Sequence, residues 1–116
     1  MTENLIDPEA WEMMKSMADH DFMIELIDTY LSDSPGLIEQ MRTGLSTGSI
    51  EVVRRAAHSL KSNSASFGAN RLANASRDLE MLAKGGSLDG GGPMLALIEA
   101  EYTLIVPQLL ERKNEC

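Results

Sequence analysis

The sequence predicts an all-α fold, an antiparallel four-helix bundle with an additional short N-terminal helix. Apolar residues recur at spacings of three and four along almost the whole chain, and β-branched residues are few and scattered. Proline and glycine fall between segments of helical length, which short turns would join as antiparallel neighbours. At 116 residues, 43% of them hydrophobic, the chain can bury one core, so we expect a single domain over residues 1–116.

The first expected helix is short and begins at Pro8, because Asp7 can cap its free amides and proline suits the first helical position. Its apolar side is expected to carry Trp11, Met14 and Met17. It should end before residues 19–21, Asp-His-Asp, where an aspartate caps the second helix. We favour this cap over a metal site, because three adjacent residues on a helix cannot all face one ion.

The second expected helix is long and contains Pro35. Its apolar periodicity resumes in phase after residues 34–36, Ser-Pro-Gly, so we expect one kinked helix rather than two. Gly44 and Gly48 bracket the turn that closes it. Its apolar stripe comprises Met23, Leu26, Ile27, Tyr30, Leu31, Leu37, Ile38, Met41 and Leu45.

Three further elements complete the bundle. The third helix should run from residue 49 or 50 to about residue 67, and the fourth from residue 69 to about residue 84. Five glycines among residues 85–92 predict a flexible loop. The last helix is expected to start at Pro93, and Pro107 should bend it or begin its end.

The charge and composition exclude several function classes. With 18 acidic and 10 basic side chains the net charge is −8, which disfavours binding to nucleic acid or to an anionic membrane. The single cysteine, Cys116, cannot form an intramolecular disulfide. No apolar run approaches the roughly 20 residues of a membrane span, and residues 1–10 lack the pattern of a secretory signal. We therefore expect a cytoplasmic protein with no nucleic-acid or membrane partner.

The third helix carries a histidine that is expected to face solvent. On a wheel of about 100° per residue, the side opposite His58 holds Val52, Val53, Ala56, Leu60 and Phe67. The face of His58 itself holds Glu51, Arg54, Arg55, Lys61, Ser62 and Ala65. A lone exposed histidine is usually an ordinary surface residue, so this placement alone does not establish a site.

The charge around this histidine differs from that of the rest of the chain. Residues 52–77 hold five basic side chains and no acidic one, so the other residues hold 18 acids and 5 bases, a charge of −13. Neighbouring cations favour the neutral imidazole and would stabilise an anionic group attached to it, such as a phosphoryl group. The same basic run could instead be a solvated face that lowers the domain's self-repulsion.

A linear motif favours the first interpretation. Residues 57–64, Ala-His-Ser-Leu-Lys-Ser-Asn-Ser, are followed by Phe-Gly-Ala at 67–69, by Leu72 and by Leu-Glu at 79–80. This pattern resembles the signature of histidine-containing phosphotransfer (HPt) domains, with a lysine three residues after the histidine and glycine-alanine ten and eleven residues after it. Residues 21–35 also resemble the family's preceding helix, so the resemblance covers most of the chain.

The resemblance implies a role for individual residues. His58 would accept and donate a phosphoryl group, and Lys61, one turn along, would neutralise its oxygens. Gly68 would permit close packing of the third and fourth helices. Ser62 stands where the family usually has glycine. Its hydroxyl should slightly narrow the space through which a partner's active-site loop approaches His58. Asn63 replaces a small hydroxyl residue and, lying toward the apolar side, must find hydrogen-bond partners between helices. The expected partner-binding residues are Arg54, Arg55, Ser62, Ala65 and Gly68.

The expected function is that of a phosphoryl carrier in a His-Asp phosphorelay. No motif for holding and splitting ATP is present, so we expect no enzyme, no cofactor and no metal in this chain. The expected partners are response-regulator receiver domains, whose acidic pocket would hold Mg²⁺, and a hybrid sensor histidine kinase is a further candidate. The alternative is a non-catalytic helical adaptor that binds a receiver or kinase without being phosphorylated, which the departures at Ser62 and Asn63 favour. A monomer is expected.

Overall fold

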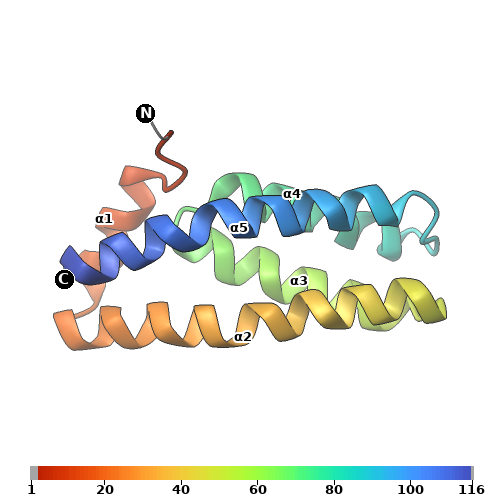
Figure 1. Ribbon diagram of the computed structural model, residues 1–116, viewed down its shortest axis with the longest axis horizontal. Coiled ribbons are helices and arrows are strands. Elements are labelled where there is room, and N and C mark those ends of the chain that lie inside the picture. The colour runs from red at the N-terminus through yellow and green to blue at the C-terminus, as the bar shows by residue number, and fades with distance from the viewer. Residues whose placement is uncertain (1–2, 116) are drawn as a thin grey trace.

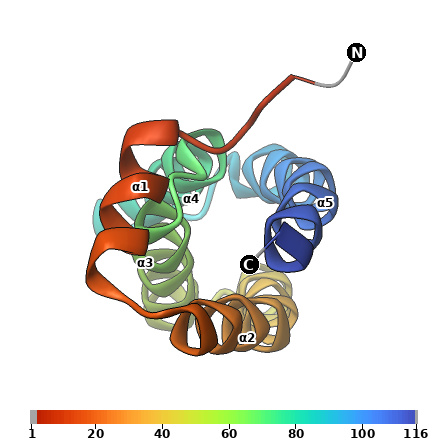
Figure 2. The ribbon, with the colours of Figure 1, turned by 90° about the vertical axis from the view of Figure 1, so that its left-hand side faces the viewer.

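The computed structural model describes residues 3–115, and this part of the chain forms five α-helices. They are α1 (Pro8–Met17), α2 (His20–Thr47), α3 (Ile50–Ser66), α4 (Asn70–Lys84) and α5 (Gly91–Glu115). The four long helices alternate in direction and form a ring in which α2 packs on α3, α3 on α4, α4 on α5 and α5 on α2 (Figure 2). The short α1 lies at one end of the bundle, against α3 (Figure 1). The expected antiparallel four-helix bundle with a short N-terminal helix is confirmed.

The starts of α1 and α2 are set by aspartate caps, as the sequence predicts. The Asp7 side chain accepts a hydrogen bond from the amide two residues on, and the Asp19 side chain accepts one of 2.8 Å from the amide of Phe22. α2 then continues through Pro35 as one helix, in agreement with the phase of its apolar stripe. The hydroxyl of Ser34, one residue earlier, donates to the carbonyl of Tyr30 at 2.6 Å.

The core-facing side of α3 differs from the helical wheel at two positions. Val52 is 41% exposed instead of buried, because the helix turns Val53 and its neighbours toward α2 and α4. Asn63 is exposed, and the polar residue between the helices is its neighbour Ser64, which is fully buried. The hydroxyl of Ser64 lies 2.8 Å from that of Tyr30 on α2, so each satisfies the other within the core.

The ends and the proline of α5 also differ from expectation. The helix begins at Gly91, so the predicted loop ends at Gly90 and Pro93 lies in the first turn. Proline is tolerated there because the first amides of a helix have no intrahelical acceptor. Pro107 neither ends the helix nor begins its end, since α5 continues to Glu115. Pro107 is on the exposed side, where water can bond the carbonyl that it leaves unpaired.

α1 is attached through the turn between α3 and α4. Gly68 in this turn has φ +78° and is buried, and its carbonyl accepts a 2.8 Å hydrogen bond from the amide of Asp7. Trp11 is buried with its ring 6.3 Å from that of Phe67. Met17, expected on the apolar side of α1, is instead 78% exposed, because it lies in the last turn, past the contact with α3.

α5 is more apolar than expected from the sequence. Within the described residues it is the one helix long and apolar enough to cross a membrane by length and composition: an 18-residue stretch of it has a mean hydropathy of 1.2, which corrects the expectation that no run approaches a span. In the fold it is a bundle helix that turns Leu95, Ile98, Ile105 and Leu109 into the core. Only 28% of that stretch is buried, so the fold packs one side of the helix and leaves the other side exposed.

Candidate functional site

His58 lies in the middle of α3 on the side that faces solvent, as the wheel predicts. Its side chain is 55% exposed. The residues that α3 turns inward next to it, Ala56 and Ala57, are small and fully packed, so the helix is held close to its neighbours. One edge of the imidazole faces α4, and the remainder of the ring is open to a partner.

A buried carboxylate holds both residues that the motif singles out. Glu80 of α4 has a side chain only 5% exposed. Its Oε2 lies 2.6 Å from Nδ1 of His58, and its Oε1 accepts a 2.7 Å hydrogen bond from Nζ of Lys61. The histidine and the lysine are thus joined through one acid on the neighbouring helix.

The ionisation of Glu80 fixes the direction of these hydrogen bonds. Burial raises the pKa of its carboxyl group, but the hydrogen bonds and charges of Lys61 and His58 outweigh burial, and the pKa ends below its ordinary value. An ionised carboxylate can only accept, so Nδ1 of His58 must carry the proton that it shares with Glu80. In the neutral imidazole the lone pair is then on Nε2, the nitrogen that Glu80 does not hold.

Lys61 lies one turn from His58, as expected, but it is engaged by Glu80. Its side chain is 30% exposed. An ammonium has three donors, so one bond to Glu80 leaves two that can face an anion near the imidazole. The geometry is compatible with the predicted phosphoryl-stabilising role and adds that Lys61 is positioned by Glu80.

The predicted partner-binding residues fall into three groups. Arg54 and Arg55 both pair with Glu51, with 2.9 and 3.0 Å between the guanidinium Nε atoms and the carboxylate. Ser62 and Ala65 are exposed on the face of His58, as predicted. Gly68 is not on this face. It lies beneath the start of α1, where its backbone contacts Asp7. Its lack of a side chain therefore permits the close approach of α1, a contact that the sequence does not predict.

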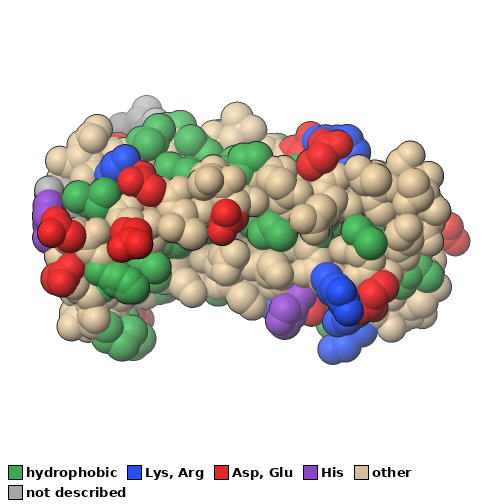
Figure 3. Space-filling model, turned by 90° about the horizontal axis from the view of Figure 1, so that it is seen from below, with side chains coloured by type: hydrophobic (Ala, Val, Ile, Leu, Met, Phe, Trp, Pro, Cys, Tyr) green, Lys and Arg blue, Asp and Glu red, His purple; other side chains and the backbone are tan. Residues whose placement is uncertain are grey.

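The basic region inferred from the sequence is largely neutralised in the fold. Glu51 pairs with two of its arginines, Glu80 with Lys61, and Glu101 with Arg71 at 2.6 Å. The hydrogen bond from Arg54, chief among these contacts, holds the pKa of the Glu51 carboxyl well below its usual range. On the face shown in Figure 3, acidic side chains lie beside the basic ones.

The motif includes Glu80, but the sequence does not predict its contacts with His58 and Lys61. The available signal is its register: Glu80 falls on the apolar stripe of its helix, seven residues after Ala73 and three before Ala83, both of which are buried. A charged residue on a buried stripe is almost always paired, and the partner was the histidine one helix away.

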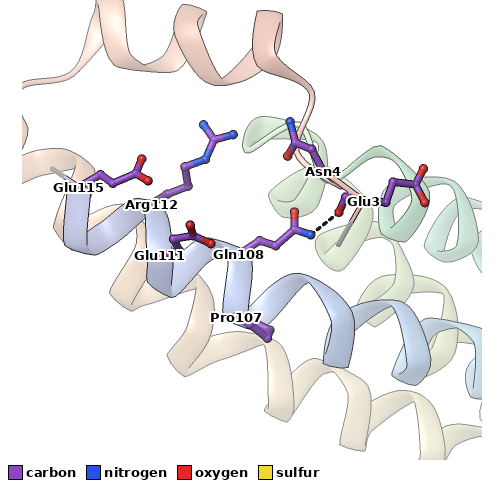
Figure 4. Close-up of a pocket in the computed structure, with 7 residues that line it drawn as sticks. All are labelled: Glu3, Asn4, Pro107, Gln108, Glu111, Arg112 and Glu115. Atoms are coloured by element: carbon purple, nitrogen blue, oxygen red, sulfur yellow. Dashed lines mark hydrogen bonds between the residues drawn. The ribbon is translucent and has the colours of Figure 1, made fainter. Parts of the chain in front are cut away.

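A surface hollow lies away from His58. It has a volume of about 410 Å³, is formed by the C-terminal part of α5 and the N-terminal segment, and does not include His58 (Figure 4). Its main polar contact links Gln108 to the carbonyl of Glu3 at 2.6 Å, which fastens the segment to α5.

A smaller hollow of about 240 Å³ lies closer to the His58 face, between α1, α2 and α3. It is lined by apolar and polar side chains, among them Met14, Tyr30, Asn63, Ser66 and Phe67.

Comparisons with known proteins agree with this geometry. The Hpt domain family model matches residues 25–109, which include His58, Lys61 and Glu80. The solved structure of histidine-containing phosphotransfer protein B (HptB) from Pseudomonas aeruginosa PAO1 superimposes with a TM-score of 0.90 over 99% of each chain, at 22% sequence identity. A search of curated proteins finds no match. The structural likeness establishes the fold, and the family match over most of the chain establishes that this protein belongs to the Hpt domain family.

Proposed function

We propose that this protein carries phosphoryl groups on Nε2 of His58, accepting them from a phospho-aspartyl receiver domain and passing them to another. Membership of the Hpt family supports a role in phosphorelays. The observation that carries the residue assignment is the half-exposed imidazole whose Nδ1 is held by the buried carboxylate of Glu80.

The proposed transfer uses Nε2 of His58 as the nucleophile and is supported by the contacts of its imidazole with Glu80. The Nε2 lone pair attacks phosphorus, the bond from phosphorus to the receiver's aspartyl oxygen breaks, and the receiver's carboxylate is regenerated. Because Nδ1 keeps its proton, positive charge develops on the ring as the new bond forms. Glu80 accepts from that Nδ1–H and stabilises this charge, while Lys61 offers its free donors to the phosphoryl oxygens. The reverse sequence of steps returns the group to an aspartate.

In this proposal Glu80 positions His58 and Lys61, and Lys61 supplies positive charge to the phosphoryl group. The partner supplies the rest of the positive charge that stabilises the phosphoryl oxygens. Residues 3–115 hold no cluster of histidine, cysteine, aspartate or glutamate suited to a metal ion. We propose that the receiver brings Mg²⁺ in its acidic pocket and docks over the exposed side of α3, where Ser62 and Ala65 are small. The hollow between α1, α2 and α3 would extend this contact on one side of His58. A hybrid sensor histidine kinase carrying such a receiver would meet the same surface.

Radiolabelled phosphoryl transfer from a phosphorylated receiver tests the proposal. The protein should acquire acid-labile, base-stable phosphate, and His58→Gln should acquire none. His20→Gln is the matched control, because His20 is the other histidine of the chain and is also exposed, and it should be labelled like the wild type.

Two results would contradict the proposal. Labelling that persists in His58→Gln would place the phosphoryl group on another residue. Binding of the receiver without any label in the wild-type protein would identify the chain as an adaptor, the alternative function that the substitutions at Ser62 and Asn63 suggest.

A further inference from the structure

The outward side of α5 is apolar although it faces solvent. Leu97, Leu104 and Leu110 are 50%, 49% and 43% exposed. The only charged residues from Gly91 to Leu110 are Glu99 and Glu101, and both are engaged from neighbouring helices, by Arg42 at 3.0 Å and by Arg71 at 2.6 Å. From Gly91 to Leu110 the helix thus presents an exposed face without unpaired charge in a strongly acidic protein.

The centre of this face follows the spacing of a helix–helix contact. Six residues lie four, three, four, three and four positions apart, and we call them the α5 seam: Pro93, Leu97, Ala100, Leu104, Pro107 and Glu111. Alternation of three and four is the repeat along which one helix packs against another. The seam is about 27 Å long at the rise of an α-helix. All six residues are exposed.

The seam is complementary to itself when reversed. If two copies of α5 run antiparallel about a two-fold axis, Ala100 of each copy lies opposite Leu104 of the other, so a small side chain meets a large one. Glu111 then lies opposite Pro93, in the first turn of the other helix. That turn has no acidic residue of its own, and a carboxylate near the positive end of a helix dipole is favourable.

We propose that the α5 seam binds a second copy of this chain, forming a weak antiparallel α5–α5 dimer in place of the monomer expected from the sequence. The complementarity of Glu111 to the other helix start favours a second copy over a lipid surface, and the net charge of −8 further disfavours an anionic membrane. α5 and α3 lie on opposite sides of the bundle (Figure 2), so both His58 side chains stay accessible in the dimer. One helix pair buries less than a standard interface, so the dimer is weak and concentration-dependent.

Sedimentation equilibrium over a series of concentrations tests the dimer. The wild-type mass should rise from 12.7 kDa toward twice that value, and Leu97→Glu should remain at 12.7 kDa. Met81→Glu is the matched control: Met81 is 55% exposed on α4, outside the seam, and the variant should associate like the wild type. Circular dichroism establishes that each variant is folded.

The outcomes separate the seam from other causes. A wild-type mass of 12.7 kDa at every concentration overturns the proposal, and so does equal association of the two glutamate variants. Binding of the wild type, but not of Leu97→Glu, to phosphatidylcholine vesicles without self-association would assign the seam to lipid and overturn it as well.

Cysteine cross-linking tests the orientation. In a Cys116→Ser background, Leu97→Cys and Pro107→Cys should form a mixed disulfide with each other when combined and oxidised, because these positions are opposed in the antiparallel pair. Preferential cross-linking of each variant to itself would indicate a parallel pair and contradict the proposed geometry.

Discussion

At the scale of single residues, the site depends on how one carboxylate is shared. Glu80 binds the imidazole through one oxygen and the ammonium through the other, so it orients His58 and Lys61 together. Such a residue acts through its neighbours rather than on the phosphoryl group. Its effect should therefore appear in the rate of transfer and not in whether His58 can be labelled.

We expect Glu80→Gln to slow phosphoryl transfer from a receiver by about ten- to a hundredfold, the equivalent of a hydrogen bond to a charged group. The amide can still accept from Nδ1 but no longer balances the positive ring. Rapid-quench kinetics would measure the effect, with Asp78→Asn as a control, since Asp78 is an exposed acid two residues away on the same helix. Equal rates in Glu80→Gln and wild type would remove Glu80 from the mechanism.

The pH dependence of stability gives an independent readout of the same residue. The folded-state pKa of Glu80 is lowered, so its contribution to stability is present above its unfolded pKa, near 4.3, and is lost as the pH falls through the folded value. Urea unfolding at neutral and acidic pH should therefore show a smaller loss of stability on acidification in Glu80→Gln than in the wild type. A larger loss in the variant would mean that Glu80 is not the stabilised acid.

Single residues also show which parts of the site can be predicted from the sequence. The exposure of His58 followed from periodicity alone, because the opposite face of α3 is clearly apolar. The contact with Glu80 depends on the register between α3 and α4, which periodicity within one helix does not contain. Asn63 and Ser64 lie side by side near the boundary of that face, and only the position of Tyr30 on α2 decides that Ser64 is the buried one.

At the scale of elements, the turn after α3 is a joint for three helices. Gly68 combines a left-handed φ of +78° with a close approach to α1: a Cβ there would lie 2.9 Å from the carbonyl oxygen of Asp7. Gly48, which ends α2 at φ +72°, has open space around it. Both glycines therefore need a left-handed backbone conformation, but only Gly68 also lies close to another helix.

Replacement of each glycine by alanine should separate these effects. Gly48→Ala should cost about 1–2 kcal/mol of unfolding free energy, the ordinary penalty of a left-handed alanine. Gly68→Ala should cost at least about 1 kcal/mol more, because α1 must shift as well. Urea unfolding gives the free energies, and limited proteolysis within α1 should accelerate only in Gly68→Ala. Similar losses in both variants would show that α1 adapts to the added methyl group without strain.

The boundaries of the elements show where sequence signals are ambiguous. Asp7, Pro8 and Asp19 placed the starts of α1 and α2 correctly, because a side-chain cap acts locally. Pro93 predicts a helix that starts at that residue, yet any position in the first turn accepts proline, and α5 begins two residues earlier.

At the scale of the whole molecule, charge is distributed in pairs rather than in opposed regions. The sequence places five basic residues in one segment, but four of them meet acids from elsewhere in the fold or from the preceding turn of α3. Long-range attraction of an acidic receiver pocket should consequently be modest. Near His58, Glu51 reduces this attraction because it pairs with both Arg54 and Arg55.

We expect Glu51→Gln to increase the association rate with a receiver several-fold at low ionic strength and to steepen its salt dependence, because Arg54 and Arg55 lose their intramolecular partner. Stopped-flow association over a salt series would measure both quantities. Glu39→Gln removes the same charge beside Arg42 on α2 and should change the rate little. Identical responses in the two variants would attribute the change to net charge alone.

The loop between α4 and α5 turns at the end of the bundle opposite to α1 (Figure 1). It contains Gly86 and Gly90, both with positive φ and open space where a side chain would begin. Extra residues in a surface loop of this kind cost little closure entropy. A peptide tag or a fluorophore inserted there would remain far from α1 and would leave the His58 face of α3 uncovered, so this loop is the natural attachment point for following partner exchange in real time.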